Sequence, residues 1–378
     1  MKMLDQRRTF SDRSDSSCGP VVSRRQALLA GVSAAALAWG GCGLSRRAWG
    51  QKADPERPDM ITADTEKAIQ RGLRYLARTQ SRDGSWRTSG WSGGYPTAMS
   101  SLAVLALMAG GNTPVEGEYS RNVRLAIDHL VNTANQNRDT GVIADLSIEQ
   151  SCMHGHGFAM LALGEAYGME QDKSRQNTIR GVLERAIKLT GNSQSAAGGW
   201  LYQPNSNGDE GSVTVTQIQG LRSCRNAGIK VPKTIIDRAC NYIKMSQQPD
   251  GGIAYRVGQG GTQPPITAAA VAVMYSAGQY ENEVAHKCLE YCVKQVKNNP
   301  RIFEQGHKFY AMLYLAQAMY LSSEENWKMY FPNVRDDLLR TQGSSGEWHG
   351  DGVGDTYGTA IATIVLQLPY ANLPIFQR

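Results

Sequence analysis

The chain has 378 residues, of which 41% are hydrophobic and 20% charged, with a formal net charge of +6. Eight of its 40 basic and three of its 34 acidic residues lie in the first fifty positions, so the remainder holds 32 basic against 31 acidic residues, a balance of +1. The basicity therefore belongs to the N-terminal segment, and the rest of the chain gives no electrostatic reason to expect a nucleic-acid partner.

The N-terminal segment, residues 1–50, has the pattern of a bacterial export signal with a linker. Ser23–Leu29 reads SRRQALL, and the apolar stretch at 28–39 is too short for a stable transmembrane span. We interpret it as a twin-arginine signal, which makes the twin-arginine (Tat) export machinery a partner and the periplasm or cell envelope the destination. Cleavage is expected near 48–50. Cys42 is a candidate lipid anchor, although the residues before it match a lipobox poorly.

One short pattern, Gln-x-x-x-Gly-x-Trp, recurs along the rest of the chain. Three full copies and a fourth with Ile for Trp occupy Gln80–Trp86, Gln194–Trp200, Gln342–Trp348 and Gln247–Ile253. Weaker candidates at Gln136 and Gln295 fill the two gaps and make successive starts 47 to 58 residues apart. A period near fifty residues is typical of a solenoid or a closed ring. The three Trp residues are expected to be structural.

The segments before and after each motif differ in kind. Apolar residues spaced three and four apart precede the motifs, which predicts amphipathic helices with one buried face. Their apolar stripes begin at Ile69, Val123, Ile179, Ile236 and Val284. The segments that follow are apolar nearly all round and rich in Ala, at 97–108, 155–163, 266–275, 309–320 and 359–368, with a more polar counterpart at 213–227.

Six units of amphipathic helix, Gly-rich turn and apolar helix predict an all-α fold in two concentric layers. The apolar helices form the inner ring and the amphipathic helices the outer ring of an (α/α)6 toroid that spans residues 60–378. A closed ring is favoured over an open solenoid because polar capping repeats are not evident at either end.

These motifs and their helical pairs resemble the squalene and oxidosqualene cyclases and the β subunits of protein prenyltransferases. The resemblance covers residue 62 to the C-terminus, and the chain looks most like exported bacterial proteins labelled as prenyltransferase or squalene-oxidase repeat proteins. It implies that the Gln and Trp of each motif tie successive repeats together. It also implies a central cavity for an isoprenoid chain.

The catalytic signatures of these families are missing. Against the Asp-x-Asp-Asp acid of the cyclases the chain offers only Arg335–Leu338, which reads RDDL on an outer helix. The Asp-x-Tyr-His segment that supplies a zinc ligand in prenyltransferases matches Asp355–Gly358, with Gly358 in place of the ligand. The Gly-Cys-Gly-Glu-Gln of thioester domains has no counterpart, since Gly41–Gly43 is followed by Leu44. No metal site and no cofactor are therefore predicted.

Two histidines open the second apolar helix, in Cys152–Gly157, which reads CMHGHG. His156 resembles the position from which a His-Gly pair in prenyltransferases helps to hold a diphosphate, and a helix N-terminus favours anions. His154 is its neighbour in a Cys, His, His alternation of the kind that can ligate a metal, although a fourth ligand is not identifiable. The alternative for His156 is a hydrogen-bonded polar residue of the rim.

Other polar residues open the remaining apolar helices, whose starts meet at one end of a ring. His307, Asp351 and Asp355 are candidate catalytic groups. Tyr202, Tyr310 and Tyr357 are candidate ligand contacts, together with His154 and His156. The two Asp residues could do acid–base work, but their Gly-rich setting fits turn or helix-cap roles equally well.

Three functions stay open from the sequence. The first is a cavity protein that binds or transforms an isoprenoid-like or other apolar ligand with a polar head. The second is a non-catalytic binding or scaffold protein of the cell envelope, favoured by the missing acid and zinc ligands. The third is a glycan-active toroid. A deep aromatic pocket would favour the first, a filled centre the second and an open acidic cleft the third.

Overall fold

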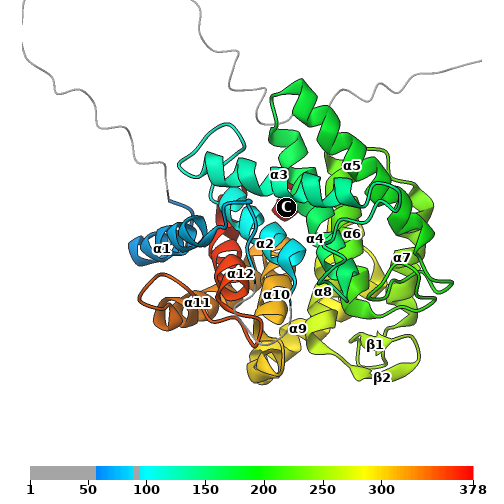
Figure 1. Ribbon diagram of the computed structural model, residues 1–378. Helices are drawn as coiled ribbons and strands as arrows, with labels where there is room; N and C mark the ends of the chain where they lie inside the picture. Colours follow the sequence, from blue (N-terminus) through cyan, green and yellow to red (C-terminus); the bar gives the residue numbers. More distant parts are fainter. Residues whose placement is uncertain (1–56, 88–93, 378) are drawn as a thin grey trace, which may run out of the picture. The chain divides into compact units, whose positions relative to one another are not determined.

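The computed structural model describes residues 57–87 and 94–377, so the predicted export signal, its cleavage position and Cys42 lie outside the described residues. In those two ranges, α-helices alternate between two layers (Figure 1). The outer layer comprises α1 (Ala63–Thr79), α3 (Ser120–Gln136), α5 (Lys173–Asn192), α7 (Lys233–Met245), α9 (Glu283–Asn298) and α11 (Glu324–Thr341). The inner layer comprises α2 (Pro96–Ala109), α4 (Cys152–Met169), α6 (Gly211–Asn226), α8 (Pro264–Ser276), α10 (Lys308–Ser322) and α12 (Asp355–Gln367).

The inner helices form a closed ring. Each packs against the next in chain order from α2 to α12, and α12 packs back against α2. In Figure 1, α12 (red) accordingly lies beside α2 (cyan), and α1 lies next to α11 and α12. This confirms the (α/α)6 toroid predicted from the repeat.

The inner and outer helices differ in burial as predicted. Every residue of α2 is buried, whereas α1 buries one stripe that includes Ile69, Leu73 and Leu76. The stripe predicted for α7 is rotated slightly, since Ile235 and Tyr242 fill the buried face while Ile236 is half-buried. Helices with apolar residues on all sides are stable here because both of their faces are covered by neighbours.

The polar character of α6 has a structural reason. The side-chain amide of Gln217 donates to the carbonyl of Met153 at 2.6 Å. That of Gln219 donates to the Gln317 side-chain carbonyl at 2.8 Å. Because α6 and α10 are separated in the ring by α8, the second bond crosses the ring interior, where both side chains are buried. These bonds pair the side-chain N–H groups of both glutamines, whereas the Gln217 side-chain oxygen has no hydrogen-bond partner among the described residues.

Each motif glutamine joins two successive outer helices. Gln194 Nε2 donates to the carbonyls of Gly198, at 2.8 Å, and of Ile235 in α7, at 2.9 Å. Equivalent bonds reach the next outer helix at Asn122 from Gln80 and at Val284 from Gln247. The bond from Gln342 runs to Ala68 in α1 at 2.9 Å, so the last joint closes the ring onto the first helix.

Each motif tryptophan joins the outer helix to the inner helix of its own unit. Trp200 is fully buried, its indole N–H donates to the Thr190 carbonyl at 2.7 Å, and its backbone N–H donates to Thr214 Oγ1 at 3.0 Å. The same pair of bonds runs from Trp86 to Leu76 and Ser100, and from Trp348 to Leu338 and Thr359. Ile253 keeps the backbone bond, to Thr267. The structural role predicted for these tryptophans follows directly from these contacts.

The two weak motif positions were placed wrongly. The second joint begins at Asn137, one residue after Gln136, with Gly141 at φ 83° in the glycine position and buried Ile143 in the Trp position. Asn137 Nδ2 donates to the carbonyl of Ala144 at 2.8 Å, within its own turn. Gln295 lies inside α9 and starts no joint; the 3₁₀ helix η1 (Pro300–Glu304) makes that connection.

Short elements complete the described chain. An antiparallel hairpin of β1 (Ala254–Arg256) and β2 (Gln259–Thr262), which the sequence did not predict, follows the fourth motif. Two 3₁₀ helices, η2 (Leu368–Tyr370) and η3 (Pro374–Phe376), end it, and η3 packs on α6. Among the helices described, we find none long and apolar enough to cross a membrane.

Candidate functional site

A cavity of about 550 Å³ opens where the inner helices begin. All six inner helices contribute to it, either from their first turns or from the loops that lead into them. Its lining in the described chain comprises Tyr95, Ala98, Met99, Leu102, Ser151, His154, Phe158, Tyr202, Ser212, Tyr255, Gln263, Pro265, Ile266, His307, Tyr310, Val353 and Tyr357. Its volume falls within the roughly 300–1,000 Å³ that small-molecule sites occupy.

The described lining is mostly aromatic and aliphatic, and besides its tyrosines the polar side chains are two histidines, two serines and one glutamine. It includes five tyrosines and one phenylalanine, and it includes no Asp, Glu, Lys or Arg side chain. The Gln219–Gln317 bond lies about two helical turns further along α6 and α10 than the lining residues Ser212 and Tyr310. The Gln219–Gln317 bond therefore crosses the ring interior beyond the inner end of the cavity, and the cavity itself is a mostly apolar chamber.

Five of the predicted site residues meet in this cavity. They are His154, His307, Tyr202, Tyr310 and Tyr357. The inner-helix starts thus converge on one mouth, as expected. Inner and outer helices alternate along the chain, so all six inner helices run in the same direction and begin at the same end of the ring.

His154 is held in place by two neighbours. Its Nε2 lies 3.1 Å from Ser212 Oγ, and its ring stacks on Tyr202 with 5.9 Å between ring centres. Burial, aided by the nearby His307, lowers the pKa of His154 to about 4. A pKa in that range leaves the imidazole neutral at physiological pH.

The tyrosines of the lining differ in how their hydroxyls are bonded. Those of Tyr202 and Tyr255 bond to each other. That of Tyr310 is buried and has no hydrogen-bond partner among the described residues, while its ring meets Tyr314 edge-on with 4.8 Å between centres. Burial raises the pKa of Tyr310 well above its ordinary value, so this hydroxyl keeps its proton.

The carboxylates near the mouth cap the N-termini of inner helices. Glu149 accepts the backbone N–H of Thr97 at 2.7 Å, which caps α2. Asp351 accepts the N–H of Phe309 at 3.1 Å, which caps α10. Burial raises the pKa of Glu149 to about 7 and also raises that of Asp351. The cap role that the sequence left open for Asp351 is the one its geometry fits, because the N-terminal N–H groups of a helix need acceptors.

His156 does not line the cavity. It is fully buried between α4 and α5, where Nδ1 accepts the backbone N–H of Ile143 at 3.1 Å and Nε2 lies 3.1 Å from Thr190 Oγ1. It occupies in the second unit the place that Thr214 holds in the third. The predicted ligand contact is corrected to a structural one, since both ring nitrogens are already bonded within the protein.

Asp355 also lies outside the cavity lining. Its carboxylate is 2.6 Å from Nδ1 of the exposed His349. This hydrogen bond raises the pKa of His349. As the first residue of α12, Asp355 is placed where a negative charge is favoured by the helix dipole.

Several lining residues were missed from the sequence, and two carried a usable signal. Tyr255 stands two positions after Ile253, as Tyr202 stands two positions after Trp200. Phe158 follows His154 by four positions, on the same helix face. Tyr95 and Gln263 precede their helices in turns for which the repeat gives no pattern.

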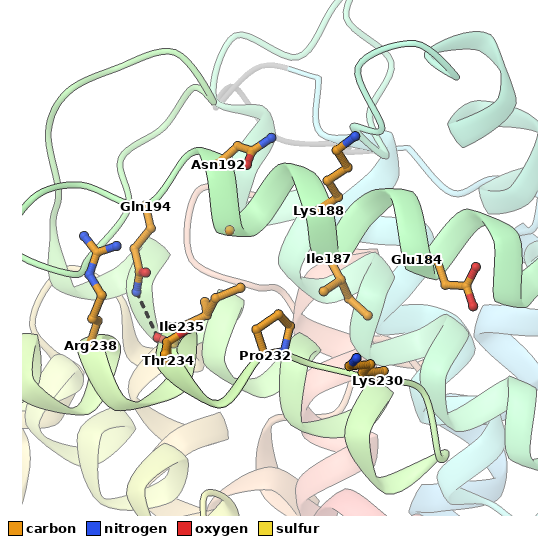
Figure 2. A pocket seen from close by; sticks show the side chains of 11 residues that line it. Glu184, Ile187, Lys188, Asn192, Gln194, Lys230, Pro232, Thr234, Ile235 and Arg238 are labelled. Carbon is orange, nitrogen blue, oxygen red and sulfur yellow. Dashed lines mark hydrogen bonds between the residues drawn. The ribbon is translucent and has the colours of Figure 1, made fainter.

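A second hollow, of about 500 Å³, lies outside the ring between α5 and α7 (Figure 2). Its walls carry the charged side chains of Glu184, Lys188, Lys230 and Arg238, and no aromatic residue lines it in the described chain. The motif residue Gln194 forms one end, where its bond to Ile235 appears as a dashed line (Figure 2). This hollow is therefore the seam between two outer helices, a product of repeat packing.

Among the described residues, no three His, Cys, Asp or Glu side chains lie close enough together to hold a metal ion. Cys152 and His154 do not form such a group with a third ligand, although they stand two positions apart. Burial instead raises the pKa of the Cys152 thiol to about 11, which opposes the thiolate that metals bind.

No family model and no curated protein matches the sequence, but solved structures share its fold. A protein from Actinoplanes is 15% identical, with a TM-score of 0.56 over 82% of this chain and 99% of its own. An inactive variant of the α-1,6-mannanase GH76A of Salegentibacter, in complex with α-1,6-mannotriose, is 8% identical, with a TM-score of 0.58 over 82% and 99%. A variant of the type II terpene cyclase MstE from Scytonema, in complex with the product merosterolic acid A, is 14% identical, with a TM-score of 0.53 over 82% and 98%.

At these identities the likeness shows the fold alone. The protein is an α/α toroid, an architecture that it shares with a terpene cyclase and with mannanases. The resemblance noted in the sequence is thereby supported at the level of the fold, and the choice of ligand rests on the residues of the cavity.

Proposed function

We propose that the protein binds an apolar, isoprenoid-like ligand in the chamber at the mouth of its inner ring, with the ligand's polar end among the histidines. The observation that carries this proposal is the aromatic and aliphatic lining of the cavity. The described residues of that lining include no Asp, Glu, Lys or Arg. A related toroid, the cyclase MstE, has been solved with geranylgeranyl dihydroxybenzoate as its substrate.

The same observation argues against acid-initiated cyclisation. Protonation of an alkene needs a carboxylic acid facing the chamber, but the carboxyl groups of Glu149 and Asp351 accept backbone hydrogen bonds at the N-termini of α2 and α10. Asp355 pairs with His349 outside the lining. We therefore propose binding and presentation of the ligand as the function that the site supports best.

The glycan-active alternative has the likeness to mannanases in its favour. Glycoside hydrolysis uses two carboxyl groups on either side of the scissile bond, and none lines the described cavity. The scaffold alternative calls for a filled centre, whereas the mouth of this ring is hollow. Export by the twin-arginine route stays part of our proposal and would place the ligand in the periplasm or envelope.

Native mass spectrometry with lipid extraction of protein from its own envelope tests the proposal. We expect a co-purifying apolar lipid, displaced when Ala98→Phe fills the chamber. Ala98 is a buried lining residue, whereas Ala196 is exposed in a joint turn, so Ala196→Phe is the matched control and should retain the lipid. Clean apoprotein from the native envelope, together with no uptake of added polyprenyl lipids, would overturn the proposal.

A further inference from the structure

The Ser212 hydroxyl lies between two proton acceptors at the edge of the cavity. Its Oγ is 2.7 Å from Glu210 Oε1, 2.8 Å from Glu210 Oε2 and 3.1 Å from His154 Nε2. His154 Nε2 and Glu210 Oε1 are themselves 3.9 Å apart. Ser212 and His154 line the cavity and are partly exposed, whereas Glu210 is fully buried. A hydroxyl that is bonded to a base and open to a cavity has the arrangement of an activated nucleophile.

The Ser212 hydroxyl meets a base in either protonation state of Glu210. When Glu210 is ionised, its carboxylate accepts the Ser212 proton, and His154 can donate to Oγ. When Glu210 holds a proton, it donates that proton to Oγ, and the Ser212 proton is directed to His154 Nε2. In each state one base is therefore hydrogen-bonded to the hydroxyl and able to take its proton as Oγ attacks.

This cluster is held in place by local contacts and departs from the repeat. The Glu210 carboxylate accepts two backbone N–H groups at the start of α6, and the Glu210 N–H donates to the Trp200 carbonyl at 2.9 Å. The ring of Tyr202 stacks on His154 and orients it. Among the six inner helices as described, α6 alone is capped by the side chain of its own N-cap residue. Repeat packing therefore does not account for the cluster.

The rest of the lining favours a carboxylic ester as the reacting group. The Tyr202 and Tyr255 hydroxyls share one hydrogen bond, so one of their two protons has no acceptor among the described residues and can donate to a carbonyl oxygen in the cavity. The aromatic and aliphatic walls suit a long apolar chain. A phosphate ester would enter without a cationic partner, because the described lining holds no Lys or Arg.

We propose that Ser212 is a nucleophile and that the cavity cleaves a carboxylic ester carried by its apolar ligand. Ser212 Oγ bonds to the ester carbon, the ester C–O bond breaks, and the hydroxyl proton passes by way of the base to the leaving alcohol. Water then attacks the acyl–Ser212 ester, which releases the acid and restores the hydroxyl. This inference rests on the proposed function, the binding of an apolar ligand in the same cavity.

Covalent labelling of the full chain tests the nucleophile. A long-chain alkyl fluorophosphonate reacts with activated serines, because a bond forms between Oγ and phosphorus as fluoride leaves. Intact mass and peptide mapping then locate the adduct, which we expect on Ser212. Ser195 is the internal control, since its hydroxyl donates to Asp209 Oδ2 at 2.8 Å but does not line the cavity. It should stay unlabelled.

Hydrolysis of p-nitrophenyl esters measures turnover. Ser212→Ala should lower kcat/KM for the decanoate at least roughly a hundredfold, whereas Ser195→Ala should leave it unchanged. Thermal melts check that both variants are folded. The wild type should cleave the decanoate at least roughly tenfold faster than the acetate, since the longer chain buries more apolar surface in the cavity.

The outcomes separate the ester chemistry from the binding on which it rests. An unlabelled Ser212, a folded Ser212→Ala variant with wild-type turnover, or equal rates on decanoate and acetate would overturn the inference while the cavity keeps its proposed function. Labelling of the wild type needs no variant, so it decides the matter even where Ser212→Ala does not fold. No uptake of a fluorescent apolar lipid by the folded wild type would overturn both.

Discussion

The seams between the repeats and the mouth of the inner ring differ in how far their residues repeat. At a seam, the Gln194 amide and the Trp200 indole donate to backbone carbonyls, and the same residue types return in other units. At the mouth, the residues change from one unit to the next. Both regions hold buried oxygens without a hydrogen-bond partner among the described residues, Gln194 Oε1 at a seam and the Tyr310 hydroxyl at the mouth. Repetition of residue types therefore indicates architecture, whereas their variation marks the candidate site.

The sharpest test of the seams is the close approach at their glycines. Gly198 has φ 101°, and a Cβ there would meet the carbonyl of Arg238 in α7. Gly198→Ala should therefore cost about 3–5 kcal/mol of unfolding free energy, from backbone strain plus overpacking. Urea denaturation followed by circular dichroism measures it.

Gly228 supplies the matched control. It has φ 81°, but a Cβ there would have no atom within 4 Å. Gly228→Ala should cost only the backbone strain, about 1 kcal/mol. Equal losses in the two variants would mean that the seam does not depend on this close approach.

His154 and His156 are separated by one residue but belong to different regions, His154 to the mouth and His156 to the seam. His156→Ala removes a ring that is bonded on both sides in the buried core, so it should destabilise the protein by about 3 kcal/mol. His154→Ala should cost under about 1 kcal/mol, since this side chain is 27% exposed and makes one hydrogen bond, to Ser212. Thermal melts and ligand affinity, measured together, check the contrast.

The two variants should therefore differ in opposite ways in stability and in ligand binding. The His156 variant should bind ligand normally at temperatures where it is folded, and the His154 variant should be stable but bind weakly. If His154→Ala proved the more destabilising of the two, the division between seam and mouth would be wrong.

Buried groups in both regions should make stability depend on pH, in opposite senses. Burial raises the pKa of Glu149, near the mouth, from 4.5 to about 7, so between these values the folded protein holds a proton that the unfolded chain has lost. The contribution of Glu149 to stability therefore falls as the pH rises through this interval and stays lower above it. Burial lowers the pKa of His154 and of the seam residue His156 from 6.5 to about 4, so their contributions rise with pH over that interval.

Glu149→Gln keeps an acceptor for the Thr97 N–H and removes the titration. It should flatten the loss of stability between pH 5 and 8 by on the order of 2–3 kcal/mol, measured by urea denaturation at each pH. Glu165, whose pKa burial also raises to about 7, retains its own share of the slope. The exposed Glu184→Gln is the control; an identical slope in all three proteins would contradict the prediction.

The sequence was sufficient for the ring because the seams are local. A Gln, a Gly and a Trp at fixed spacing bond to backbone atoms, and such contacts recur whatever the neighbouring side chains are. The second joint was misplaced by one residue because Asn137 replaces the glutamine, and the fifth was expected at Gln295 where the chain remains helical. A weakened repeat leaves too little signal to fix its register.

The site was harder to predict because its members come from all six units. The sequence indicates which residues stand at inner-helix starts, and five of these do line the cavity. It does not indicate which way a side chain near a helix start turns. His154 and His156 differ by two positions, about 200° around a helix, so one faces the chamber and the other the outer layer.

The smallest expected effect concerns the joint that closes the ring. Gln342 links α11 to Ala68 in α1, whereas Gln194 links neighbours in the middle of the chain, and each makes two bonds. Both Gln→Ala variants should lose about 1–2 kcal/mol. Only Gln342→Ala weakens the contact between the first and last outer helices, which Arg71 (to Gly343) and Arg335 (to Met60) also bridge, so hydrogen exchange should quicken in α1 and α11 while α5 and α7 stay protected. Unchanged exchange in α1 and α11 of that variant would show that closure is shared by many contacts and does not depend on this joint.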